Sequence, residues 1–475
     1  MARAVAIFGG RRRDVNMTEG GIAKNLIRFA FPLLLGNLFQ QLYNMVDTWV
    51  IGQTGNNDAY AAVGSVAPII NILIGFFMGL ASGAGVIISQ YYGAKDEEKV
   101  KKAVHTAATL TLILGVIFTV IGVLMIPTVL NLMLHSDADV ATVYPHAKEY
   151  LTIYFAGVMG LMVYNMGSGI LRAVGDSTHP FYYLVVSAII NIVLDLVFVF
   201  EFDMGVAGVA YATVIAQCTS AILTVITLLR TESCVRVILR ELKIDTSMLK
   251  MIVRIGIPAA IQMALTAFSN VFVQSYIANA NLDQTIALGS WTSYSKIDQF
   301  IFLPVQSLAL ATTTFVGQNL GVGNVKRARK GTTVAYLMST AAATVIIVAV
   351  MAFAPFLAGI FNPDPDVVHY ATLLLRTITP FYLCTSVNQI FSAALRGAGN
   401  TRAPMIIMLC SFVGFRQLYL FVMSNYISND LLPIGMGYPA GWLACCITTL
   451  IYYRCFSFEK SRLIKAPADR VENAA

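Results

Sequence analysis

Residues 107–126 read AATLTLILGVIFTVIGVLMI, an unbroken apolar stretch without a charged side chain. A helix of about 20 such residues crosses a hydrocarbon layer about 30 Å thick. Similar runs recur down nearly the whole chain, and they predict twelve membrane-spanning helices. The predicted spans are residues 25–51, 59–89, 103–133, 143–171, 180–201, 205–229, 251–280, 285–317, 331–360, 367–395, 404–427 and 437–457.

The composition agrees with lipid as the surrounding solvent. Of the 475 residues, 57% are apolar and 12% are charged, which would leave a soluble domain of this size short of polar surface. A membrane β-barrel is disfavoured, because its strands alternate polar and apolar residues over about ten positions. The runs found here are longer and continuously apolar. We therefore expect an all-α polytopic membrane protein.

Basic and acidic residues alternate from one predicted loop to the next. Apart from Lys148, Lys296, Arg376 and Arg416, every Lys and Arg lies in or beside a segment that faces the cytoplasm if the N-terminus does. The other loops carry the acidic residues Asp58, Asp137, Asp139, Glu201, Asp203, Asp283, Asp364, Asp366 and Asp430. This positive-inside pattern predicts a plasma-membrane protein with both termini in the cytoplasm. Because the basic residues are spread over many segments, the net charge of +7 does not indicate nucleic-acid binding.

The two halves of the chain are similar in sequence. Arg28-Phe-Ala-Phe-Pro32 aligns with Arg254-Ile-Gly-Ile-Pro258, Gln90-Tyr-Tyr-Gly93 with Gln318-Asn-Leu-Gly321, and Leu171-Arg-Ala-Val-Gly-Asp176 with Leu395-Arg-Gly-Ala-Gly-Asn400. This repeat predicts two six-helix lobes. Since each has an even number of helices, the repeats are parallel, an arrangement in which transporters place a substrate cavity between rocking halves. The expected boundaries are a cytoplasmic segment 1–24, an N-lobe 25–229, a linker 230–250, a C-lobe 251–457 and a cytoplasmic tail 458–475.

Four polar residues of the first half are expected at one depth. A charge inside a membrane helix costs about 2.5–3.5 kcal/mol on insertion scales, so such residues mark candidate functional sites. Asp47, Asp195 and Thr213 fall in the outward half of their spans, and Asn191 lies one turn from Asp195 on the same helix face. Two carboxylates, an amide and a hydroxyl suit a hard cation such as Na⁺, or a carboxyl pair that shares a proton. The structural alternative is that Asp47 only marks a helix end and Asp195 is satisfied by neighbouring hydroxyls.

Other polar and flexible residues suggest a cavity and a hinge. Pro32 weakens the hydrogen-bond ladder below Asp47, which permits either a moving hinge or a static bend. Gln40, Tyr43 and Asn44 suit a wet cavity better than lipid. The candidate methionines of a binding wall are Met159, Met162, Met166 and Met263, although methionines at such positions commonly serve only packing.

The second half carries Lys296, Asp298, Arg376 and Arg416 within its predicted spans. Asp298 either neutralises one of these cations or contacts a substrate or a proton. Lys296 and Asp298 point to different helix faces, which favours partners from other helices.

The sequence lacks the usual motifs for nucleotide binding, for a zinc site and for paired reactive cysteines. No GxxxxGK[ST] sequence occurs, so the chain offers no site for direct ATP drive. The histidines form no HExxH sequence and the cysteines form no CxxC pair. We therefore expect a protein that is not an enzyme and that needs no cofactor besides a coupling ion. We also expect it to work as a monomer.

The residues around these sites resemble a known family. Leu42-Tyr-Asn-Met-Val-Asp-Thr-Trp-Val-Ile-Gly52, Gln90-Tyr-Tyr-Gly-Ala94, Leu171-Arg-Ala-Val-Gly-Asp176 and Asn191-Ile-Val-Leu-Asp195 are similar to segments of the multidrug and toxic compound extrusion (MATE) transporters. The resemblance covers roughly residues 20–455. It implies a V-shaped pair of lobes that exports organic, often cationic and amphipathic, compounds in exchange for Na⁺ or H⁺.

The resemblance also implies roles for individual residues. In the branch with archaeal and DNA-damage-inducible-type members, an N-lobe cation site corresponds to Asp47, Asn191, Asp195 and Thr213, and a bending proline corresponds to Pro32. Other members carry acidic residues on helices 7 and 10, which this chain lacks in their interiors, so N-lobe coupling is favoured. A lipid flippase of the same superfamily and an ion channel are the alternatives. The substrate and the choice between Na⁺ and H⁺ stay open.

Overall fold

The computed structural model describes residues 15–54, 57–133, 137–461 and 463–464. The described part is helical and contains no β-strand. Its first half consists of α2 (Ile22–Gln53), α3 (Asn57–Gly93), α4 (Glu97–Met133), α5 (Asp137–Ala156), α6 (Val158–Ala173), α7 (Thr178–Leu196) and α8 (Gly205–Arg230). The second half consists of α9 (Thr246–Ala278), α10 (Gln284–Val322), α11 (Val325–Phe361), α12 (Pro365–Ile378), α13 (Tyr382–Gly397), α14 (Arg402–Met408), α15 (Arg416–Val422), α16 (Leu431–Gly435), α17 (Gly437–Cys455) and α18 (Phe458–Ser461).

The predicted spans correspond to these helices. Within the described ranges, ten helical segments are long and apolar enough to cross a membrane, and α5 with α6 forms an eleventh span bent by 47°. The predicted span 367–395 is divided between α12 and α13 by a 3₁₀ turn at Thr379–Phe381, where Pro380 removes a backbone donor. Large apolar side chains face outward, including Leu124, Val345 and Phe356. Their exposure suits a lipid environment, and the protein is an all-α polytopic membrane protein.

π-Helical turns interrupt two of the spans. One follows α7 at Val197–Glu201, and two more flank α15 at Leu409–Phe415 and Met423–Ile427. A π-turn inserts one extra residue into a helix and is frequently found at functional sites. The first of these turns begins two residues after Asp195, at the end of α7.

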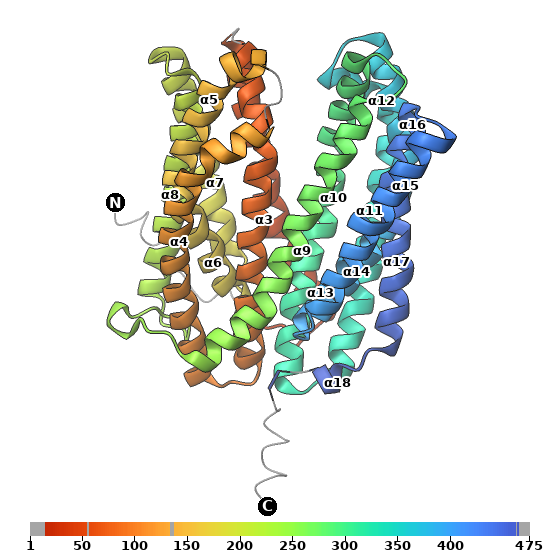
Figure 1. The fold of residues 1–475 in the computed structure, drawn as a ribbon. Helices are drawn as coiled ribbons and strands as arrows, with labels where there is room; N and C mark the ends of the chain where they lie inside the picture. Colours follow the sequence, from red (N-terminus) through yellow and green to blue (C-terminus); the bar gives the residue numbers. More distant parts are fainter. Residues whose placement is uncertain (1–14, 55–56, 134–136, 462, 465–475) are drawn as a thin grey trace, which may run out of the picture.

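The two halves form two bundles that diverge away from the end at which α18 lies (Figure 1). Helix α3 of the first bundle packs against α9 and α10 of the second. Glycine permits this approach, because a Cβ atom on Gly79 or Gly83 would overlap the backbone of Ala260 or Gly256 on α9. The contact between α3 and α9 therefore depends on small residues, as is common between membrane helices.

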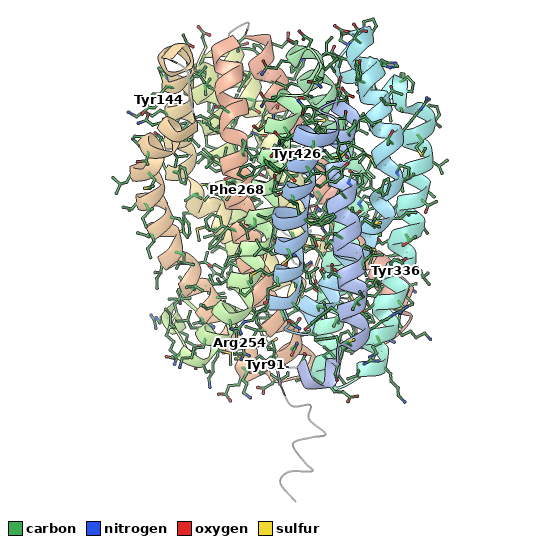
Figure 2. The ribbon with its side chains drawn as sticks, turned by 45° about the vertical axis from the view of Figure 1, so that its right-hand side comes forward. Tyr91, Tyr144, Arg254, Phe268, Tyr336 and Tyr426 are labelled. Atoms are coloured by element: carbon green, nitrogen blue, oxygen red, sulfur yellow. The ribbon has the colours of Figure 1, made fainter. Side chains whose placement is uncertain are left out.

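One basic residue of the predicted cytoplasmic set can be located in the structure. Figure 2 shows Tyr91 and Arg254 near one end of the molecule and Tyr144 near the opposite end. Arg254 belongs to the basic set predicted to face the cytoplasm. The predicted tails before residue 15 and after residue 464, and the side chains of Asp58, Asp137 and Asp139, lie outside the described residues.

Candidate functional site

The four polar residues predicted in the first half come from three helices. Asp47 lies on α2, Asn191 and Asp195 lie one turn apart on α7, and Thr213 lies on α8. Helix α7 packs against both α2 and α8. The Asp47 side chain is close enough to interact with those of Asp195 and Asn191. The structure thus brings the two carboxyl groups and the amide together.

Three of these side chains are deeply buried, and Asp47 is partly exposed. Asn191 and Asp195 have no exposed surface, and Thr213 is 6% exposed. Among the described residues, both carboxyl oxygens of Asp195, both amide atoms of Asn191, the Thr213 hydroxyl and Oδ1 of Asp47 lack a hydrogen-bond partner. More than about nine-tenths of buried polar groups in folded proteins have one. Leaving so many unpaired in one place costs free energy unless a further species binds there.

A cavity of about 100 Å³ is lined by Asp47 and Thr213, but Asn191 and Asp195 are not among its lining residues. One wall is a single face of α2, formed by Gln40, Tyr43, Asn44 and Asp47 at helical spacing. The predicted wet face of this helix therefore lines the cavity. The other lining residues are Ile70, Ile74, Tyr150, Tyr154, Leu161, Tyr164, Leu184, Ser187, Thr213, Gln217 and Ser220.

Sequence reasoning missed several polar lining residues. Tyr150 and Tyr154 of α5 stack with ring centroids 6.3 Å apart, and Gln217 lies next to Tyr154. The Tyr154 hydroxyl and Oε1 of Gln217 also lack hydrogen-bond partners. A rule of one helical turn would have found some of them, because Ser187 precedes Asn191 by four residues and Gln217 follows Thr213 by four.

The candidate methionines do not gather at this cavity. Met159 packs against Gly115 of α4, whereas Met162 lies in the core among α3, α5 and α8. Met166 lines a separate apolar pocket between α4, α6 and α8, and Met263 lies on α9 against Gly75 of α3. Met159, Met162 and Met166 pack within the first bundle, and Met263 lies where the two bundles meet.

Pro32 lies inside α2, which runs continuously from Ile22 to Gln53. It is partly buried, close to the beginning of the helix that carries Asp47. The backbone of Pro32 cannot donate to the carbonyl one turn earlier, at Arg28. This missing bond is the local weakness that a hinge at this position requires.

The charged residues of the second half do not pair with one another among the described side chains. Asp298 accepts a hydrogen bond from the Tyr294 hydroxyl at 3.3 Å. Arg416 is 1% exposed, donates to Oδ1 of Asn270 at 3.0 Å and lies between the rings of Phe412 and Tyr438. Lys296 is partly buried and Arg376 is exposed. No direct ion pair joins Asp298 to one of these cations among the described residues, although Arg416 lies near enough to interact with it electrostatically.

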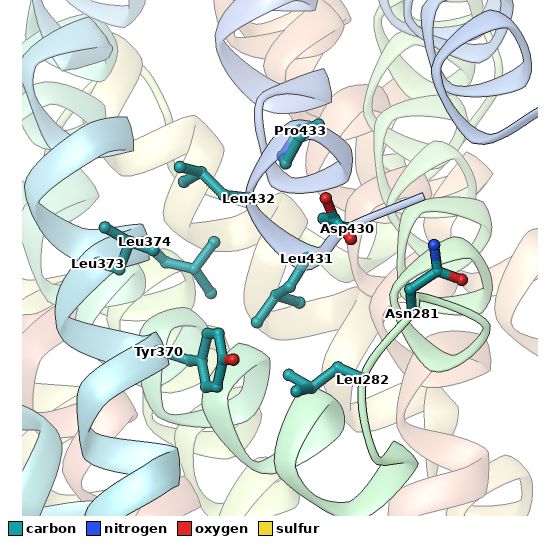
Figure 3. Close-up of a pocket in the computed structure, with 9 residues that line it drawn as sticks. All are labelled: Asn281, Leu282, Tyr370, Leu373, Leu374, Asp430, Leu431, Leu432 and Pro433. Carbon is teal, nitrogen blue, oxygen red and sulfur yellow. The ribbon is translucent and has the colours of Figure 1, made fainter. Parts of the chain in front are cut away.

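A larger cavity of about 310 Å³ lies in the second bundle (Figure 3). It is lined by Asn281, Leu282, Tyr370, Leu373, Leu374, Asp430, Leu431, Leu432 and Pro433. Asp430 is its one acidic lining residue, and its carboxylate accepts a hydrogen bond from Ser428 at 2.7 Å. Because this carboxylate is exposed and already bonded, the smaller N-lobe cavity is the stronger candidate for ion binding.

Comparison with known proteins places the chain among transporters. A sequence model of the MatE family matches residues 32–197 and 258–421. A probable multidrug resistance protein of Bacillus subtilis, YoeA, is 30% identical over 461 residues, covering 94% of this chain and 96% of that protein. A probable multidrug resistance protein of Thermotoga maritima, NorM, is 27% identical over 93% of this chain and 94% of its own length. The solved outward-facing structure of a multidrug resistance MATE family transporter superposes with a TM-score of 0.86, at 25% identity, over 94% of this chain and 98% of that one.

Proposed function

The chain belongs to the MATE family of membrane transporters, and on that basis we propose that it is a secondary active exporter of organic, amphipathic and often cationic compounds. Export is driven by exchange for Na⁺ or H⁺ through alternating access. One observation supports the coupling part of the proposal, namely the unpartnered oxygens of Asp47, Asp195 and Thr213 together with the unpartnered amide of Asn191. On this proposal the chain works as a monomer in the plasma membrane, with both termini cytoplasmic and no resident cofactor.

The chemistry of this donor set fits a small cation. Carboxylate, amide and hydroxyl oxygens are the ligands that hard cations take in proteins. A proton shared between Asp47 and Asp195 would also remove the repulsion of two carboxylates at close range. Either species supplies positive charge to the site, which lowers the free-energy cost of burying two carboxylates there. Asp47, Asn191, Asp195 and Thr213 would hold Na⁺ if the exporter is sodium-coupled.

Coupling follows if the cation binds one arrangement of the lobes better than the other. A ligand shifts a conformational equilibrium only by its difference in affinity for the two states. Asp47 and Asp195 lie on different helices, so a cation between them ties α2 to α7. Pro32 permits α2 to bend when that tie is released. Substrate binding then favours the opposite arrangement, and inward ion flow drives export.

Transport by purified protein in vesicles tests the proposal. Proteoliposomes loaded with a fluorescent organic cation receive either a sodium gradient or a pH gradient, never both. We expect one gradient to drive efflux and the other to leave it at the leak rate. Efflux that ignores both gradients would reject coupled antiport, and ion current far above the turnover of a carrier would favour a channel.

A further inference from the structure

The two bundles meet at one end through two glutamines that the internal repeat pairs with each other. Gln90 lies near the end of α3, and Gln318 lies at the matching position of α10. Gln90 has no exposed surface and Gln318 is 1% exposed. This is the end of the molecule at which Figure 2 shows Tyr91 and Arg254.

Each glutamine donates a hydrogen bond to the opposite bundle. Nε2 of Gln90 donates to the carbonyl of Gly397 at 2.9 Å, and Nε2 of Gln318 donates to the carbonyl of Ala173 at 2.9 Å. Ala173 and Gly397 are the last residues of α6 and α13, and the repeat pairs them too. Terminal carbonyls of a helix lack partners within it, so each amide satisfies a group that the other bundle leaves free.

The same two amides also hold the segments that enter and leave the bundles. Oε1 of Gln318 accepts from the backbone N–H of Met17 at 3.3 Å, and Oε1 of Gln90 accepts from that of Leu463 at 3.1 Å. These segments rest on matching glycines with positive φ, since Val15 contacts Gly175 and Leu463 contacts Gly399. Side chains with a Cβ atom are strained in that conformation.

Further contacts attach the N-terminal segment to the second bundle. Asn319 donates from Nδ2 to the Met17 carbonyl at 3.0 Å, and Arg327 donates from Nη2 to the carbonyls of Glu19 and Gly20, both at 2.9 Å. The segment therefore belongs to the chain of the first bundle but is bonded to the second. The backbone N–H of Val15 donates to the Gly175 carbonyl of the first bundle at 3.0 Å, so separation of the bundles at this end must break the bonds of the segment to one bundle or the other.

The backbones of α3 and α10 touch beside the glutamines. A Cβ atom on Gly93 would overlap the carbonyl oxygen of Gln318, and one on Gly321 would overlap that of Gln90. The two contacts are again related by the repeat. Such close approach leaves no room for water or solute between the helices at this level.

From these reciprocal contacts we infer that Gln90 and Gln318 form a two-part latch that closes this end of the transporter, with residues 15–17 and Leu463 as straps over it. The inference rests on the alternating-access cycle proposed above, because a latch matters only if the bundles separate here during the cycle. Both halves of the latch release together when this end opens. Because they are equivalent by the repeat, loss of either should favour the open state to a similar extent.

Distances between spin labels across this end test the latch. Labels are placed at Glu97→Cys and Lys326→Cys, which are exposed in the first turns of α4 and α11, after the seven native cysteines are replaced. Gln90→Glu and Gln318→Glu exchange a donating N–H₂ for an oxygen that faces a carbonyl oxygen. We expect each to raise the population with long label distances by on the order of three- to tenfold, and the double variant to raise it further.

Gln262→Glu is the matched control. Gln262 is 5% exposed, and its Nε2 contacts Sδ of Met408 within the second bundle. This variant should leave the distances unchanged. If the glutamate variants do not fold, Gln90→Met and Gln318→Met remove the same donors without adding a charge. Unchanged label distances in the folded Gln90 and Gln318 variants would show that these residues do not hold this end closed, whether or not the protein exports its substrate. If the distances change as expected but no gradient drives export, the proposed function is rejected and the latch is not.

Discussion

Asp47 on α2 and Asp195 on α7 place their carboxyl groups against each other inside the first bundle. Both oxygens of Asp195 and Oδ1 of Asp47 lack hydrogen-bond partners in the described part of the chain. Two facing carboxylates in a buried site repel unless a proton or a cation lies between them. This pair therefore carries the energy coupling in the proposed cycle.

Replacing either carboxylate should uncouple transport. We expect Asp47→Asn and Asp195→Asn each to lower gradient-driven efflux from proteoliposomes by about tenfold or more, since each removes one of two charges that bind the ion. Asp366→Asn is the control, because Asp366 is an exposed residue in the first turn of α12. Protein yield should stay similar in all three. Undiminished efflux in both site variants would reject the site.

Thr213→Val should weaken coupling while it stabilises the protein. The Thr213 hydroxyl is buried without a partner, so a methyl group of the same shape removes an unsatisfied polar atom. We expect the free energy of unfolding to increase by about 1 kcal/mol, which raises the melting temperature. The ion concentration for half-maximal efflux should increase several-fold, because a ligand oxygen is lost. Ion titration and thermal unfolding measure the two effects, and a lowered melting temperature would show that the hydroxyl is bonded after all.

Pro32→Ala should stiffen α2. Proline in a helix interior costs about 3 kcal/mol relative to alanine, and the substitution restores a donor toward the Arg28 carbonyl. If bending of α2 is part of the cycle, transport slows while ion binding stays intact. The repeat supplies the comparison Pro258→Ala on α9, which has no facing carboxylate pair. Equal transport by wild type and Pro32→Ala would make the proline a static bend.

Enlarging Gly79 should separate the bundles. A Cβ atom there overlaps the backbone of Ala260, so Gly79→Val must move α3 away from α9. Overpacking of this kind typically costs about 1–3 kcal/mol. Gly64→Ala on the same helix is the control, because a Cβ atom at Gly64 meets nothing within 4 Å. Thermal unfolding in detergent should show a lower melting temperature for Gly79→Val and little change in melting temperature for Gly64→Ala.

Much of the fold was accessible from the sequence. The apolar runs predicted the spans because a helix that crosses lipid must bond all its own backbone groups and present apolar side chains. Breaks within spans were less visible. Gly157 lies between α5 and α6, and Thr379–Phe381 separates α12 from α13, yet the apolar sequence continues through both positions.

Part of the candidate site was accessible for the same reason. Asp47, Asn191 and Asp195 stood out because polar groups are costly inside a membrane helix. Tyr150, Tyr154 and Gln217 did not, because tyrosines and single amides are common in helices and reveal nothing until their partners are known. None of the four candidate methionines lines this cavity, because the rotation of each helix decides which of its faces turns inward, and their part in substrate binding stays a prediction.

The sequence by itself determined the helices, their two matching sets and the few positions where lipid would not tolerate the side chain, since these follow from local hydropathy and from the repeat. Only the tertiary structure decided that Asp47 faces Asp195 and that Gln90 and Gln318 each reach the opposite bundle. The reason is geometric. Contacts between helices depend on tilt, rotation and depth, which arise from packing over the whole molecule.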